Sequence, residues 1–124
     1  MAGHVAGWLL HPEDREALMA VFPPAYSQVV AHHVTLRAGV SQNFLLPTET
    51  EGFVVGVADD GAGAQALVVE IGGTTRRPDG STYHITWSLG SGRRPVESND
   101  VIRARGWITT GERHRVRLEP KLVR

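Results

Sequence analysis

The sequence has 124 residues, a formal net charge of zero, no cysteine, and 41% hydrophobic and 21% charged residues. This length and composition fit a single domain over residues 1–124 with its own core, because a chain of this size removes roughly 65% of its unfolded surface from water. The absence of cysteine excludes disulfides, thiolate metal sites and cysteine nucleophiles. Any chemistry must therefore use histidine, carboxylate or hydroxyl side chains.

The charges are unevenly distributed along the chain. Residues 1–75 carry two basic and eight acidic side chains, whereas residues 76–124 carry eleven basic and five acidic ones. All but one of the basic residues are arginine, whose planar guanidinium group binds phosphate through two parallel hydrogen bonds. The basic half indicates a phosphate-binding surface, and a bias of the genome toward arginine codons is the alternative.

The N-terminal part of the chain predicts one strand, over residues 5–10, and one helix. Pro12 and the acidic residues after it open the helix, because proline fits the first turn and acids lie at the positive end of the helix dipole. Prolines 23–24 end it. Its predicted buried side chains are Ala17, Leu18, Val21 and Phe22. The apolar run 5–10 is too short for a secretion signal or a membrane span, so we expect a cytoplasmic protein that binds no membrane.

Further strands are predicted along the rest of the chain, separated by turns rich in glycine, proline and aspartate. Residues 52–58 and 66–71 flank a turn that is typical of a hairpin. Residues 101–107 fit either a short helix or a strand. The other predicted strands cover residues 28–37, 82–89 and 114–118.

Two short patterns carry the chemistry: His33-Val34-Thr35 and His84-Ile85-Thr86. Side chains alternate along a strand, so each histidine shares a face with the threonine two residues later. One neutral imidazole can take a proton from water while a second, protonated one donates to a leaving oxygen, and the hydroxyls hold phosphate oxygens. These four side chains predict metal-free catalysis at a phosphodiester.

The paired His-x-Thr strands resemble the 2H phosphoesterase superfamily, which includes RNA 2′,3′-cyclic phosphodiesterases. Over about residues 20–110, the segments 22–26, 32–36, 83–86 and 95–99 are most similar to the cyclic phosphodiesterase domain of fungal-type tRNA ligases and related bacterial RNA-repair proteins. The two motifs lie 51 residues apart, closer than in many members of the superfamily, which leaves the choice of substrate open.

The resemblance implies an α+β fold, with two antiparallel sheet lobes related by pseudo-twofold symmetry, one histidine motif in each lobe, and one main N-terminal helix. It implies a metal-independent phosphodiesterase that needs no cofactor and hydrolyses 2′,3′-cyclic phosphates at RNA ends or on nucleotides, with His33, Thr35, His84 and Thr86 as its catalytic residues. We expect a monomer whose partners are RNA ends or cyclic nucleotides, together with an RNA kinase or ligase that acts on the same ends.

Five further residues are candidates for substrate binding, by nucleobase stacking or by contacts to phosphate and ribose. They are Tyr26, Arg93, Arg94, Ser98 and Asn99. Alternatively, Ser98 and Asn99 cap a helix that begins near Asp100. Trp87 fits the core better than a stacking role. His32 is predicted to face away from His33 as a structural residue.

Two other functions remain open at this point. A noncatalytic module that binds RNA ends would use the basic C-terminal half without turnover. A small interaction protein would carry the two motifs by chance, and its histidines would be neither close together nor facing a cleft. No histidine spacing typical of a metal site is present, so we expect no bound metal.

Overall fold

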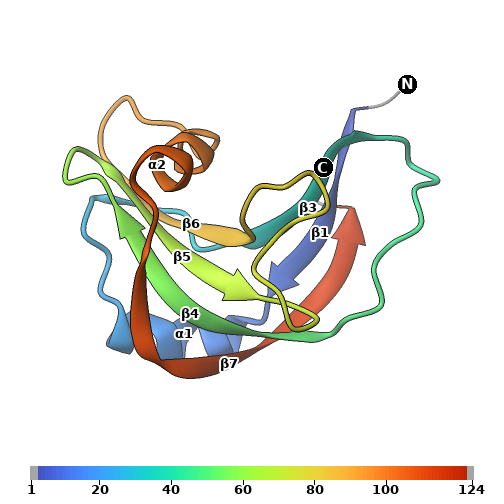
Figure 1. Cartoon of the computed structure of the whole chain (residues 1–124), viewed down its shortest axis with the longest axis horizontal. Helices are drawn as coiled ribbons and strands as arrows, with labels where there is room; N and C mark the ends of the chain where they lie inside the picture. Colours follow the sequence, from blue (N-terminus) through green and yellow to red (C-terminus); the bar gives the residue numbers. More distant parts are fainter. Residues whose placement is uncertain (1–2, 123–124) are drawn as a thin grey trace.

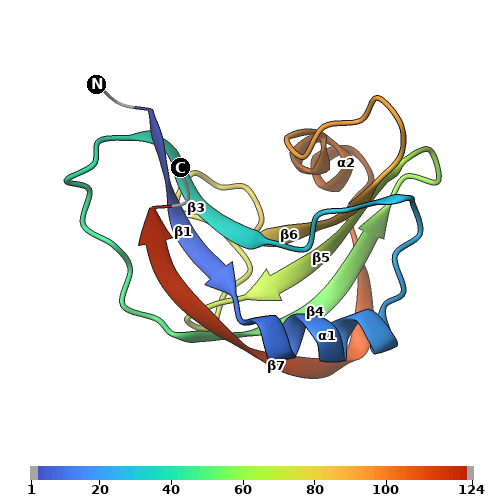
Figure 2. The same cartoon turned by 180° about the vertical axis from the view of Figure 1, so that it is seen from behind.

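The computed structural model describes residues 3–122, which form seven strands and two helices (Figures 1 and 2). The strands are β1 (His4–Leu10), β2 (Gln28–Val29), β3 (His33–Val40), β4 (Glu51–Asp59), β5 (Ala64–Glu70), β6 (His84–Leu89) and β7 (Ile108–Leu122). The helices are α1 (Pro12–Val21) and α2 (Glu97–Arg105). Neither helix is long and apolar enough to cross a lipid bilayer.

The strands form one antiparallel sheet that closes on itself. Their order is β2-β6-β3-β1-β7-β4-β5, and β5 also pairs with β6. The two helices lie on opposite sides of this sheet (Figures 1 and 2). The predicted α+β class is confirmed, and so is the hairpin, formed by β4 and β5.

The predicted continuous strand over residues 28–37 is wrong, because the chain breaks between β2 and β3. Val29 pairs with Ser88 and Val34 pairs with Ile85. The chain advances by five residues between the first two partners, Val29 and Val34, but by only three residues along β6. The two extra residues are accommodated beside Ala31, whose φ of 44° lies in the left-handed region. His32, which follows this irregularity, therefore does not obey the simple alternation of strand side chains.

Helix α1 begins at Pro12 with acidic residues in its first turn, as predicted. Its predicted buried face is partly wrong: Leu18 is buried and Phe22 half-buried, whereas Ala17 is exposed and Val21 is 51% exposed. Residues 18 and 22 lie one turn apart on one side of the helix, and residues 17 and 21 point about 100° away. Only a narrow stripe of α1 therefore contacts the sheet.

Residues 101–105 belong to helix α2, so of the two predictions for residues 101–107 the helix is correct. The helix is followed by Gly106, whose φ is 70°. It begins at Glu97, and Val96 occupies the cap position without a side-chain cap bond. The predicted capping role of Ser98 and Asn99 is therefore wrong, because both lie inside the first turn.

The core contains the two fully buried tryptophans, which confirms the core position of Trp87. Its indole N–H donates to the carbonyl of Phe22 (2.7 Å), so its one polar atom is satisfied. Trp8 packs edge to face against Tyr83. These contacts join β6 to the segment after α1, and β1 to the residue that precedes β6.

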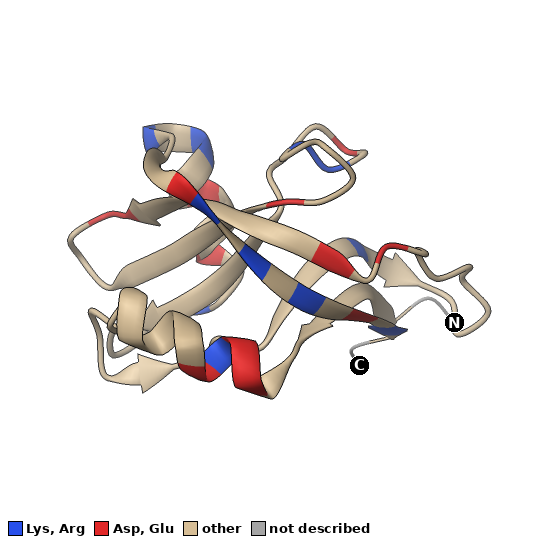
Figure 3. Cartoon of the chain, turned by 90° about the horizontal axis from the view of Figure 1, so that it is seen from below, with Lys and Arg blue, Asp and Glu red and all other residues tan. Residues whose placement is uncertain are grey.

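The arginines of β7 account for part of the uneven charge distribution. They occupy every second position of the strand, where Figure 3 colours the ribbon blue, and they pair with acidic residues from the segment 1–75. The ion pairs are Arg113 with Glu70, Arg115 with Glu51, and Arg117 with Glu13 and Asp14. These arginines neutralise acidic neighbours, so the face of β7 is not the phosphate-binding surface that the sequence indicated.

Gly7 marks the closest approach of β1 to the first histidine motif. A Cβ atom built on Gly7 would lie 2.0 Å from the carbonyl oxygen of Val34, between the two motif residues of β3. Gly7→Ala is therefore expected to lower the free energy of unfolding by about 2–3 kcal/mol, because the backbone of β3 must move. Urea denaturation measures this change.

Gly3→Ala is the matched control for this substitution, since no atom lies within 4 Å of its built Cβ. A Gly7→Ala protein with the wild-type urea midpoint would contradict the close contact between β1 and β3.

Candidate functional site

The two histidine motifs lie on neighbouring antiparallel strands. Val34 of β3 pairs with Ile85 of β6 in an antiparallel bridge, so the central residues of the two motifs lie opposite each other. Residues that face each other across such a pair share one side of the sheet. The two motifs therefore meet at their central residues.

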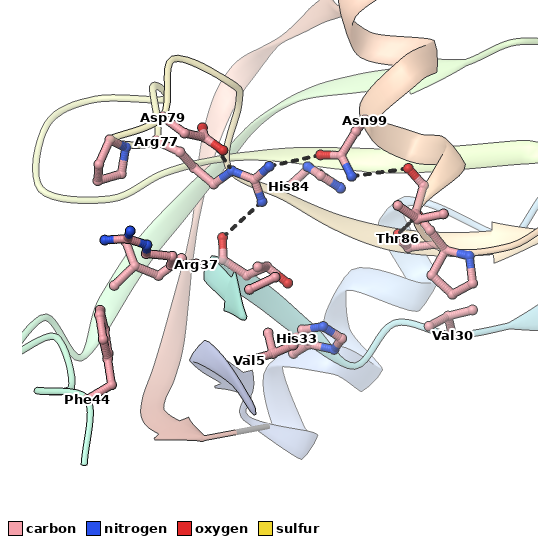
Figure 4. Close-up of a pocket in the computed structure, with 16 residues that line it drawn as sticks. Val5, Val30, His33, Arg37, Phe44, Arg77, Asp79, His84, Thr86 and Asn99 are labelled. Carbon is pink, nitrogen blue, oxygen red and sulfur yellow. Dashed lines mark hydrogen bonds and ion pairs between the residues drawn. The ribbon is translucent and has the colours of Figure 1, made fainter. Parts of the chain in front are cut away.

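All four motif side chains line one cavity of about 790 Å³. Figure 4 shows the rings of His33 and His84 on two sides of this cavity. Other lining residues include the polar Arg37, Arg77, Asp79 and Asn99 and the apolar Val5, Leu36, Phe44 and Val96. The cavity thus offers two imidazoles, hydroxyls and cations beside an apolar wall.

His84 is nearly buried, with 8% of its surface exposed. Its Nδ1 lies 2.8 Å from the carbonyl oxygen of Thr82, and a carbonyl only accepts, so Nδ1–H donates and Nε2 keeps a lone pair in the neutral ring. Burial lowers the pKa of His84 below its usual value, the Thr82 carbonyl opposes this shift, and the positive charge of Arg77 lowers the pKa further. His84 is therefore held as a neutral proton acceptor.

His33 is half-buried, and its Nδ1 lies 3.1 Å from Nδ1 of His32. Burial, followed by the charges of His32 and His84, lowers the pKa of His33 to about 4. Both cavity imidazoles are thus uncharged near neutral pH.

The two threonines differ in what their hydroxyls contact. The Thr86 hydroxyl donates to the carbonyl of Pro95 (3.2 Å) and accepts from the Ser98 hydroxyl (2.9 Å), so it fixes the segment before α2. The Thr35 hydroxyl makes no hydrogen bond within residues 3–122, whereas the Thr35 carbonyl accepts from Arg77 (3.3 Å). Of the two hydroxyls, that of Thr35 is the one free to donate into the cavity.

Arg77 is a cavity residue that sequence reasoning missed, because its segment indicated only a turn. It is 8% exposed, and its guanidinium group donates to the Ser81 hydroxyl (2.6 Å), the Asn99 side chain (2.9 Å) and the Thr35 carbonyl. The nearest carboxylate oxygen, of Asp79, lies 3.7 Å away on a largely exposed side chain. Arg77 therefore brings a weakly compensated positive charge to the cavity and joins β3 to α2.

Arg37 is a second cation on the cavity lining. Its side chain is exposed and has no ion pair within the described part of the chain. An unpaired arginine beside a cavity favours the approach of an anion.

Of the five predicted substrate-binding residues, Asn99 lines the cavity and the buried Ser98 contacts Thr86. The other three lie outside the cavity lining. The Tyr26 hydroxyl donates to Asp59 (2.6 Å), and Arg94 is exposed beside Glu97. Arg93 pairs with Asp60 (2.8 Å) and Glu97 (2.5 Å). Tyr26 and Arg93 therefore have intramolecular partners that hold the β4–β5 turn.

The prediction that the His32 side chain faces away from His33 is wrong. The irregularity at Ala31 turns the two imidazoles toward each other, with an interplanar angle of 80°. A chance occurrence of the motifs predicted histidines that do not face a cleft, and this part of that expectation is wrong, since both line one cavity.

No group of three or more histidine, aspartate or glutamate side chains within residues 3–122 is arranged to hold a metal ion. Searches against protein-family models, curated proteins and solved structures return no match to this chain.

Proposed function

We propose that this chain is a metal-independent phosphodiesterase that hydrolyses 2′,3′-cyclic phosphates at RNA ends or on nucleotides. The observation that carries the proposal is the meeting of two His-x-Thr motifs, 51 residues apart in sequence, on paired strands that line one cavity.

In the proposed reaction, water attacks phosphorus while His84 Nε2 takes a proton from that water. The bond from phosphorus to one ribose oxygen breaks, and this oxygen receives a proton through His33. The Thr82 carbonyl supports His84 as the base, because it holds the ring with its free lone pair on Nε2. Thr35 and Arg77 stabilise the negative charge on the phosphate oxygens in the transition state.

The low pKa of His33 requires an explanation within this mechanism, because an acid must carry a proton. A bound phosphate anion beside the ring favours the protonated imidazole and raises its pKa. The neutral free cavity is therefore compatible with acid–base catalysis once substrate is bound.

The test is turnover of a 2′,3′-cyclic nucleotide and of an RNA oligonucleotide that ends in a cyclic phosphate. We expect hydrolysis to continue undiminished in excess EDTA, because the proposed proton transfers use imidazoles alone. Chromatography of the 2′- and 3′-monophosphates identifies which ribose oxygen leaves. Loss of turnover in EDTA that a divalent cation restores would replace this mechanism with metal-assisted hydrolysis.

A noncatalytic module for RNA ends is the second candidate. The uncharged state of both cavity histidines and the occupied hydroxyl of Thr86 favour it. Tight binding of cyclic-phosphate ends without product over the same assay would establish this alternative.

A further inference from the structure

His32 and His33 are adjacent in sequence, yet their rings meet. The two Nδ1 atoms lie 3.1 Å apart, within hydrogen-bonding distance. In a regular strand these side chains would point to opposite faces, so the contact depends on the irregularity at Ala31.

Hydrogen bonds hold this irregular segment on both sides. The Ala31 N–H donates to the carbonyl of Thr86 (2.9 Å), and the Ala31 carbonyl accepts from the Arg15 side chain (3.1 Å). The His32 carbonyl accepts from the Leu10 N–H (3.0 Å). A positive φ at alanine is unfavourable, so these bonds maintain a conformation that brings the two imidazoles together.

The two rings have different surroundings. His33 lines the cavity that holds the proposed catalytic residues, whereas His32 is exposed and lines a second cavity of about 510 Å³. A hydrogen bond between two Nδ1 atoms requires that one of them carry the hydrogen and the other a lone pair. When His32 is the donor and His33 is neutral, the hydrogen of His33 is on Nε2.

We propose that His32 is a positioning residue that fixes the tautomer of His33 and supplies its proton. This inference rests on the proposed phosphodiesterase function. Protonated His32 donates through Nδ1 to His33 Nδ1. As His33 Nε2–H passes its proton to the leaving ribose oxygen, His33 Nδ1 takes the proton of His32, which becomes neutral. His33 Nε2 then takes up a proton from water while its Nδ1 proton returns to His32, which restores the starting state, and His84 releases to water the proton that it took from the nucleophile.

The contact with His32 explains how His33 can donate a proton despite its low pKa. A group whose pKa is about 4 is protonated in roughly one molecule in a thousand at pH 7 and in roughly one in ten at pH 5. With the proton supplied by His32, His33 passes a proton to the leaving oxygen without itself being charged in the free protein.

Other titratable or charged groups lie near the two rings. Those that line the His33 cavity are His84, Arg37, Arg77 and Asp79, and those that line the His32 cavity are His11, Arg15, Arg117 and Glu119. None of these is altered by substitution of His32, so a change in pH dependence reports on the pair.

The test compares His32→Phe and His32→Asn with the wild-type protein between pH 5 and pH 7. At pH 7 both variants are expected to lose about 100-fold in kcat/KM, and the loss should shrink by at least about tenfold at pH 5, where His33 begins to protonate directly. The Asn amide can still bond to His33 Nδ1 but cannot supply a proton. A loss that is equal at both pH values, or full activity of His32→Asn, would overturn the inference.

A second measurement needs no substrate. Imidazole ¹⁵N NMR of the free wild-type protein should show His33 in one tautomer, and His32→Phe should convert it to a mixture. If wild-type His33 is already a mixture, or is unchanged in His32→Phe, the inference fails although turnover continues. Coupled imidazoles in a protein without turnover would instead contradict the proposed function.

Discussion

Replacement of His33 or His84 by alanine is expected to lower kcat for cyclic-phosphate hydrolysis by about 10²–10⁴-fold in each case. Each substitution removes one of the two proton-transfer groups that line the cavity, and leaves the buried Val34 and Ile85 pair in place. Steady-state kinetics with a 2′,3′-cyclic nucleotide measure the loss, and circular dichroism checks that the fold is retained.

The double variant should be little worse than either single one, because base and acid act in the same step. His114→Phe is the control, since His114 packs against Phe22 outside the cavity lining. His32 cannot serve this purpose, because its ring contacts His33. A His33→Ala protein with wild-type kcat would end the acid–base assignment.

Arg77→Leu is expected to lower the free energy of unfolding by about 3 kcal/mol and to weaken anion binding in the cavity. The guanidinium group makes three hydrogen bonds from a nearly buried position, and its removal leaves the Thr35 carbonyl and the Asn99 side chain without this donor. Urea denaturation measures the stability, and KM for the cyclic nucleotide, which should rise about tenfold or more, measures the binding.

Arg77→Lys separates the contribution of Arg77 to stability from its contribution to anion binding. Lysine keeps the positive charge but lacks the planar fork, so KM should recover more than stability does. Arg105→Leu is the matched control, because Arg105 lies exposed at the end of α2 and has no ion pair within the described residues. An Arg77→Leu protein as stable as the control variant would contradict the role of Arg77 in joining β3 to α2.

The two His-x-Thr motifs could be found from the sequence because their geometry is local. In an extended strand, residues two positions apart share a face whatever the rest of the chain does. The same locality explains why the β4–β5 hairpin and the start of α1 were predicted correctly, since both depend on turn and cap residues within a few positions. Alternation failed only at His32, where the irregularity at Ala31 depends on bonds to Thr86 and Arg15.

The substrate-binding candidates show the opposite case. Tyr26 and Arg93 have the chemistry for nucleobase and phosphate contacts. In the fold, however, Tyr26 bonds to Asp59 and Arg93 bonds to Asp60, and each partner lies 33 residues away along the chain. Arg77 lies in a segment that indicated only a turn, and it is buried because the distant Thr35 and Asn99 come together around it.

The sequence by itself determined the α+β class, the hairpin and the pairing of histidine with threonine on each motif strand, because periodicity and turn chemistry act over a few residues. Only the tertiary structure decided that the two motifs share one cavity, that the arginines of β7 are neutralised, and that Arg77 rather than Arg93 faces the site. Ion pairing and burial depend on which distant segments lie next to each other, and the closure of the whole sheet determines this.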